Sequence, residues 1–194
     1  ESYKLSFGIK GTVAVFNLDV NKLNPSDQDD SKIQNINNDL SPNIGAGLYL
    51  HSDKAYLGLS VPNFIQTVTY NDNDIAIYKE KINYYLIGGY VFELDPWIKF
   101  KPAFMTKVVE GAPLQVDVSA NFMFNEKFTL GLAYRWSAAV SAMADFKISD
   151  GLFVGYSYDF DTTSLGNYNS GSHEIFLRFE IFKKNSRITT PRFF

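Results

Sequence analysis

The residues of this chain that could carry catalysis or hold a metal are few. Cysteine is absent and there are two histidines, His51 and His173. A disulfide, a thiolate zinc site and a cysteine nucleophile are therefore excluded, and a zinc site is not expected. Ser172, His173 and Glu174 have the residue types of a catalytic triad, but consecutive strand residues point to opposite faces and no nucleophile elbow surrounds the serine. The sequence predicts no catalytic triad at this position.

Acidic and glycine-rich stretches are the other candidates for ligand binding. SDQDDSK at residues 26–32 and NDND at residues 71–74 lack the glycine and the terminal glutamate of an EF-hand loop. We interpret them as solvated loop acids rather than calcium sites. GAG at residues 45–47 precedes a predicted strand instead of a helix, so it is not a nucleotide-binding fingerprint and is expected to allow close strand packing. The sequence therefore predicts no cofactor.

Most remaining charged residues belong to segments in which apolar and polar residues alternate. In LQVDVSANFMF, residues 114–124, Val116, Val118 and Phe122 fall on one face while Asp117 and Ser119 fall on the other. Such alternation indicates β-strands. We predict ten of them, near residues 3–18, 43–51, 54–61, 81–93, 97–108, 114–125, 127–136, 139–148, 151–160 and 172–182.

The connections between these strands alternate in length, although imperfectly. HSDKA, ELDPW, FNEKF and ISDGL are tight turns, whereas residues 19–42, 62–80 and 161–171 are longer connections. Short turns at one end and long loops at the other are typical of outer-membrane barrels. A strand of about ten residues, tilted by about 40°, has a height of roughly 25 Å, which matches the apolar band of such a barrel. Aromatic residues near strand ends fit its interfacial girdles, and these are Trp97, Phe124, Phe128, Trp136, Phe160 and Phe182.

We therefore predict an all-β, antiparallel, up-and-down transmembrane β-barrel of outer-membrane type, with residues 1–186 in the barrel and 187–194 as a periplasmic tail. A soluble ligand-binding barrel also alternates, but its outward face would be the polar one. The large continuous apolar faces and the small residues opposite them favour the membrane barrel. No run of about 18 apolar residues is present, so no transmembrane helix is expected. A net charge of −3 gives no footprint for nucleic acid.

In a membrane barrel the polar faces line the interior. We hypothesise that the interior charges pair across neighbouring strands and hold a filled lumen together. The alternative is a wet lumen in which each charge is solvated independently. The predicted lumen charges are Lys101, Asp117, Arg135, Asp145, Asp159, Arg178 and Glu180.

Several stretches resemble one known family. LGNYNSGSHEIFLRFEIF (residues 165–182), followed by RITTPRFF, closely resembles the C-terminal end of the PorP/SprF family, outer-membrane proteins of the Bacteroidetes type IX secretion and gliding motility machinery. LYLHSDKAYLGLSVPNF, YYLIGGYVFEL, the segment from Lys99 to Arg135 and ISDGLFVGYSYDF agree as well, in the same order. Family members are longer and begin with further strands after a signal peptide. The resemblance therefore implies that these ten strands are part of a larger barrel.

The resemblance also implies a non-enzymatic role in the bacterial outer membrane. Its expected partners are outer-membrane lipid, type IX secretion components and secreted cargo, such as the C-terminal domain of a gliding adhesin. The alternative function is an outer-membrane channel or transporter for small or apolar solutes. The matching loop is the candidate for cargo binding or a structural closure of the barrel mouth. It consists of Gly166, Asn167, Tyr168, Asn169, Ser170, Gly171, Ser172, His173 and Glu174.

The C-terminal tail is the second candidate for partner contact. Pro191 cannot donate to a strand ladder, so Arg192, Phe193 and Phe194 are expected to lie outside the last strand. Strand parity places this end in the periplasm. The terminal phenylalanine is similar to an outer-membrane assembly signal, from which the proline departs. We hypothesise that the tail closes the periplasmic mouth or contacts a periplasmic partner.

Overall fold

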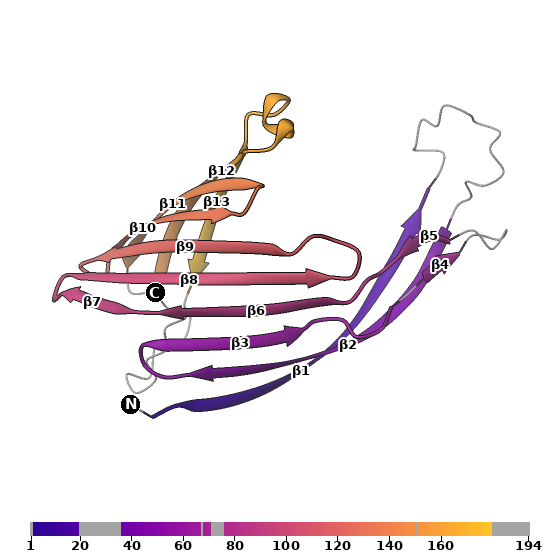
Figure 1. Cartoon of the computed structure of the whole chain (residues 1–194), viewed down its shortest axis with the longest axis horizontal. Helices are drawn as coiled ribbons and strands as arrows, with labels where there is room; N and C mark the ends of the chain where they lie inside the picture. Colours follow the sequence, from indigo (N-terminus) through magenta and orange to yellow (C-terminus); the bar gives the residue numbers. More distant parts are fainter. Residues whose placement is uncertain (1, 20–35, 67, 71–75, 150, 180–194) are drawn as a thin grey trace.

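The structure is a computed structural model that describes residues 2–19, 36–66, 68–70, 76–149 and 151–179. Antiparallel strands in these residues form one sheet of eleven strands and a separate hairpin of two (Figure 1). The described residues include no helix that is long and apolar enough to cross a membrane.

The large sheet contains the strands β1 (Lys4–Leu18), β2 (Ile36–His51), β3 (Ala55–Val61), β6 (Asn83–Tyr90), β7 (Phe92–Asp95), β8 (Ile98–Val109), β9 (Gln115–Phe124), β10 (Phe128–Arg135), β11 (Ala139–Ser149), β12 (Leu152–Asp161) and β13 (Ser172–Phe179). The separate hairpin is β4 (Val68–Tyr70) with β5 (Ala76–Lys79), and a 3-10 turn, η2 (Ser164–Asn167), lies between β12 and β13.

The strands follow an up-and-down order. Ten of them pair in the sequence β1-β2-β3-β6-β8-β9-β10-β11-β12-β13, and β7 pairs with the start of β8. The predicted all-β antiparallel fold is therefore confirmed, and each of the ten predicted strands corresponds to one strand of this path. Within the described residues β1 pairs only with β2 and β13 only with β12, so these strands do not close the sheet. The architecture is consistent with an outer-membrane barrel.

Two of the predicted connections are wrong in part. Strand β2 already begins at Ile36, and the connection at residues 62–80 contains the β4–β5 hairpin. The first half of β2 reads INNDLSPN, in which Asn38 interrupts the alternation of apolar and polar residues. It is a strand because β1 pairs with it, with Val13 opposite Pro42. A proline is tolerated there because β3 pairs with β2 only from Ala46 onward.

The two faces of the sheet differ in their side chains and in their exposure. We call one of them the outer face. In β1 up to Val15, in β3 and in β13 its residues have odd numbers. In β2, β6 and β8–β12 its residues have even numbers. Many of its large apolar side chains are exposed, up to 78% at Ile9. The opposite, inner face holds the buried polar residues Asn43, Asn121 and Thr129.

Curvature explains this difference in exposure. The large sheet is a single layer that curls across its width, so that β11–β13 run at a steep angle to β3–β8 (Figure 1). Side chains on the concave side of a curved sheet crowd together, and those on the convex side spread apart. The inner face is therefore the concave face, and the apolar outer face is left for a surrounding apolar medium.

The two ends of the sheet also differ. Tight turns at residues 52–54, 96–97 and 125–127 connect strands at one end, which we call the turn end. The connections after β1, β3 and β12 are longer and lie at the opposite end, which we call the loop end. Asn125 and Glu126 adopt positive φ of 52° and 56°, which fits a tight hairpin turn.

Candidate functional site

The predicted lumen charges that the structure describes share the inner face. They are Lys101, Asp117, Arg135, Asp145, Asp159 and Arg178, whereas Glu180 lies outside the described residues.

One group of these charges lies toward the loop end of β9 and β10. Arg135 and Asp117 are directly opposite each other, and Arg135 Nε donates to Asp117 Oδ1 at 2.8 Å. The Asp117 side chain is only 17% exposed, and its other oxygen accepts from Gln115 Nε2 at 2.8 Å. This is the cross-strand pairing that the alternation predicts, and it fixes β9 against β10 through side chains as well as through the backbone.

A second group lies nearer the turn end. Asp145 on β11 stands opposite Thr129 on β10, whose hydroxyl donates to its carboxylate. Lys101 on β8 and Arg178 on β13 both attract this carboxylate. The structure thus brings together charges from three strands, β8, β11 and β13, that are far apart in the sequence.

Asp159 belongs to neither group. It is exposed on β12, and it lies opposite Ser141 on β11 and Ser172 on β13. Its position near the loop end places an acidic side chain below the 162–171 connection.

The candidate loop between β12 and β13 has a defined conformation. Asn169 Nδ2 donates to Asp161 Oδ2 at 2.6 Å, and Tyr158 Oη donates to the Ser170 carbonyl at 2.9 Å. Gly171 has φ of +81°, which a glycine adopts without strain, and its N–H donates to Asn169 Oδ1 at 3.0 Å. These bonds anchor the loop on its own hairpin.

Within this loop Tyr168 is almost fully exposed, at 89%. It follows directly after η2, and its ring is open to solvent. A large aromatic side chain held on an ordered loop has little conformational freedom to lose on binding.

Aromatic rings line the outer face near the turn end. Tyr90 and Phe92 have centroids 4.6 Å apart, and the row continues from Phe92 to Phe100 at 6.1 Å and from Phe100 to Phe122 at 4.7 Å. The predicted girdle residues Phe124 and Phe128 form a further pair, with centroids 6.3 Å apart. Trp97 and Trp136 are exposed at opposite ends of the strands, Phe160 is exposed on β12, and Phe182 lies outside the described residues. Rows of this kind mark membrane interfaces in β-barrels.

The comparison with protein families agrees with this architecture. A family model described as type IX secretion system membrane protein PorP/SprF matches residues 1–179. The chain belongs to this family. Among proteins of curated function no match to it was found. As a PorP/SprF member the protein is a membrane component of the type IX secretion system, and the family is not a family of enzymes.

The three consecutive residues with triad-like chemistry are separated in this PorP/SprF protein. Ser172 and Glu174 lie on the inner face, opposite Asp159 and Ser157. His173 lies on the outer face, where its Nδ1 is 2.6 Å from Tyr156 Oη. Strand parity therefore keeps the histidine away from both the serine and the carboxylate, as predicted.

No group of three or more His, Asp or Glu side chains that could hold a metal occurs in the described part of the chain. The acidic clusters at residues 26–32 and 71–74 lie entirely outside the described residues, and so do Pro191, Arg192, Phe193 and Phe194. The tail and the domain boundary at residue 186 therefore remain predictions.

Sequence reasoning missed a polar cluster near the loop end. Asn43, which is 5% exposed, donates through Nδ2 to the Ile65 carbonyl at 2.8 Å and to Glu80 Oε2 at 3.3 Å. Its Oδ1 accepts from the Ile65 N–H at 3.0 Å. Asn63 Nδ2 donates to the other Glu80 oxygen at 2.5 Å. We call Asn43, Asn63, Ile65 and Glu80 the loop latch, because it ties both ends of the 62–80 connection to β2.

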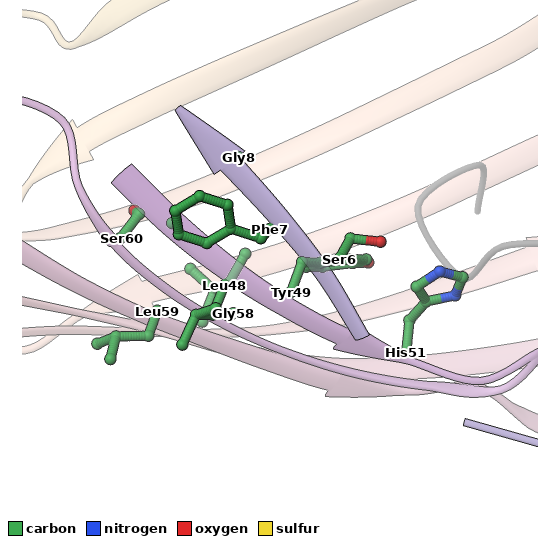
Figure 2. Close-up of a pocket in the computed structure, with 11 residues that line it drawn as sticks. Ser6, Phe7, Gly8, Leu48, Tyr49, His51, Gly58, Leu59 and Ser60 are labelled. Atoms are coloured by element: carbon green, nitrogen blue, oxygen red, sulfur yellow. The ribbon is translucent and has the colours of Figure 1, made fainter. Parts of the chain in front are cut away.

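A hollow of about 470 Å³ lies at the β1–β2–β3 side of the sheet (Figure 2). Its lining includes Gly8, Gly47 and Gly58. The rings of Tyr49 and His51, which also line it, have centroids 5.3 Å apart. Figure 2 shows the His51 ring at one end, apart from the Phe7 ring. The hollow lies beside the edge of β1 that has no strand partner among the described residues, so we assign no ligand to it.

Proposed function

We propose that this protein is an outer-membrane β-barrel of the type IX secretion and gliding machinery, and that it holds secreted cargo at the cell surface. Membership of the PorP/SprF family supports the secretion role. The exposed apolar outer face and its aromatic rows support insertion into lipid. With the tight turns in the periplasm, as in outer-membrane barrels generally, the loop end faces outward.

The cargo contact that we propose is the loop at residues 166–174. The observation that carries it is the isolated, exposed ring of Tyr168 on a loop anchored by Asn169 and Gly171. Tyrosine is enriched among residues that dominate binding energy, and a preformed loop loses little entropy when a partner binds. The adhesin C-terminal domain is the cargo class that this role implies.

Affinity purification of the full-length protein from outer membranes tests this proposal. We expect secreted cargo to co-purify, and Tyr168→Ala to reduce the retained cargo by at least about tenfold. Trp136→Ala is the matched control, because Trp136 is also an exposed aromatic at the loop end, at 70%, but lies on a short turn. Equal cargo retention by the wild type and the Tyr168 variant would contradict a contact through this loop.

A solute channel is the alternative role, and the charged inner face is the observation that favours it. Single-channel recording in planar bilayers separates the two. A large, stable conductance would support a transport barrel. Paired charges such as Arg135 and Asp117 across a filled lumen predict little or no steady conductance.

A further inference from the structure

At the loop end, the outer halves of β1 and β2 extend beyond the neighbouring strands of the large sheet (Figure 1). The two strands remain paired as far as Leu18, which lies opposite Ile36, whereas β3 pairs with β2 only from Ala46 onward among the described residues. Beyond β3 the chain continues along β2, where the Phe64 N–H donates to the Ile44 carbonyl at 2.8 Å. We call residues 11–18, 36–44 and 62–66 the loop-end extension.

The outer face of this extension is apolar and open. Val13 and Val15 on β1 are 65% and 55% exposed, and Leu40 on β2 is 63% exposed. Val13 lies directly opposite Pro42, which is also exposed, and Val15 lies directly opposite Leu40. We call these four residues the apolar platform. They continue the apolar row of the outer face without a break, because the next outer-face residue of β2 is Ile44.

The platform stands higher than the lipid-facing part of the other strands. Val15 and Leu40 lie eleven residues along β1 and β2 from the Lys4–His51 pair at the turn end, whereas Tyr134 on β10 lies six residues from Phe128. At about 3.4 Å per residue and a tilt of about 40°, these rows are roughly 29 Å and 16 Å high, and the apolar band of such a barrel is about 25 Å tall. The upper half of the platform therefore lies above the hydrocarbon of the membrane.

Hydrogen bonds hold the loop-end extension in shape. Asn43 binds both the N–H and the carbonyl of Ile65 through its side chain and also donates to Glu80, so the loop latch fastens the 62–80 connection to β2. Near the tip, the N–H of Asn38 donates to Asn17 Oδ1 at 2.7 Å, beside an irregularity in the β1–β2 register. A two-stranded ribbon alone is only marginally stable, and these contacts support it. A preformed surface loses little entropy when a partner binds.

We propose that the apolar platform docks against an uncharged, apolar surface of a partner protein at the cell surface. The outer face carries no charged residue on β1 from Gly11 to Val15 or on β2 from Leu40 to Ile44, so the matching surface is apolar as well. The height of the platform favours a protein over lipid chains as its cover. That the partner is a component of the secretion machinery rests on the proposed function, and the platform is separate from the loop at residues 166–174.

Single cysteines at Val15 and Leu40 report what covers the platform, because the chain has no cysteine of its own. A charged maleimide that does not cross lipid is applied to outer membranes of the producing cells. It is also applied to the purified full-length protein in vesicles of total outer-membrane lipid from the same cells. Reaction rates are expressed relative to Ser137→Cys, whose position is exposed on a short turn at the loop end. Val15→Cys and Leu40→Cys should react at least about fivefold more slowly in native membranes than in vesicles, because the core of an interface excludes water.

A charge placed on the platform tests whether apolar contact is the cause of this protection. Leu40→Glu should bring the rate of Val15→Cys in native membranes to within about twofold of its rate in vesicles, because a carboxylate is costly to bury in an apolar interface. Ser137→Glu adds the same charge outside the platform and should leave the protection unchanged.

Three results would overturn the proposal. Slow reaction of Val15→Cys in vesicles as well would mean that lipid or a second copy of this chain covers the platform. Fast reaction in native membranes would mean that nothing covers it, and protection that survives Leu40→Glu would mean that the contact is not apolar. Protection should persist in Tyr168→Ala, and cargo retention through Tyr168 is measured in its own assay, so either idea can fail alone.

Discussion

Gly155 provides the sharpest test of the inner-face packing. It is buried on β12, and Phe176 lies opposite it on β13. A Cβ built on Gly155 would meet Cε1, Cζ and Cδ1 of the Phe176 ring closer than any real contact allows, with Cδ1 at 2.7 Å. Gly155→Ala must therefore displace the ring, and we expect the free energy of unfolding to fall by about 1–3 kcal/mol.

Two further variants decide whether this contact is the cause. In a Phe176→Ala background, Gly155→Ala should cost less than about 0.5 kcal/mol, which gives a coupling energy of at least about 0.5 kcal/mol between the two positions. Gly8→Ala is the matched control, because a Cβ on Gly8 meets nothing within 4 Å. It should be neutral or slightly stabilising, since alanine restricts the unfolded chain more than glycine does.

Urea unfolding of the protein refolded in detergent measures these differences. Trp97 and Trp136 are exposed at opposite ends of the strands and serve as fluorescent reporters. Equal destabilisation by Gly155→Ala and Gly8→Ala, or additive effects of Gly155→Ala and Phe176→Ala, would refute the reasoning, because the ring would then not cover the glycine.

Three other predictions concern the ends of the sheet. Asn43→Ala should lower the free energy of unfolding by about 1–3 kcal/mol, because it leaves the Ile65 N–H and the Glu80 carboxylate without the Asn43 amide; an unchanged urea midpoint would argue against the loop latch. Ser137→Gly should stabilise the β10–β11 turn by about 0.5–1 kcal/mol, because Ser137 has φ of 55°, and a lower thermal midpoint would contradict this. Deletion of residues 187–194 should preserve barrel assembly, followed by heat-modifiable gel mobility, while impairing cargo attachment; loss of the folded barrel would make the tail an assembly element.

Alternation identified the strands of the β9–β12 region because each faces two different environments. Leu130 and Leu132 are exposed on the outer face, while Gly131 and Ala133 face crowded neighbours on the inner one. A one-residue shift in register would exchange the two faces, so the pattern specifies the pairing strongly.

Long-range contacts explain what the sequence could not show. The start of β2 is mostly polar, and its pairing with β1 is a contact between distant parts of the sequence. The loop latch joins Asn43 to Ile65 and Glu80, which are 22 and 37 residues away, and no local pattern announces it. Charge pairing of Asp117 with Arg135 was predictable from alternation, whereas the stacking of Arg178 on Phe153 was not. The sequence did hold one signal for this contact, because Phe153 falls among the polar positions of β12.

The central claim is that the apolar outer face meets lipid and the polar inner face lines the barrel. Because the chain has no cysteine, single cysteines for spin labels can be introduced at Leu132 on the outer face and at Ser119 on the inner face without background labelling. Collision with oxygen and with a water-soluble nickel complex in reconstituted membranes then measures the surroundings of each label. We predict that oxygen access is higher at Leu132 than at Ser119, and that nickel access is higher at Ser119 than at Leu132. A label at Leu132 that is shielded from both, within a water-soluble particle, would contradict the account.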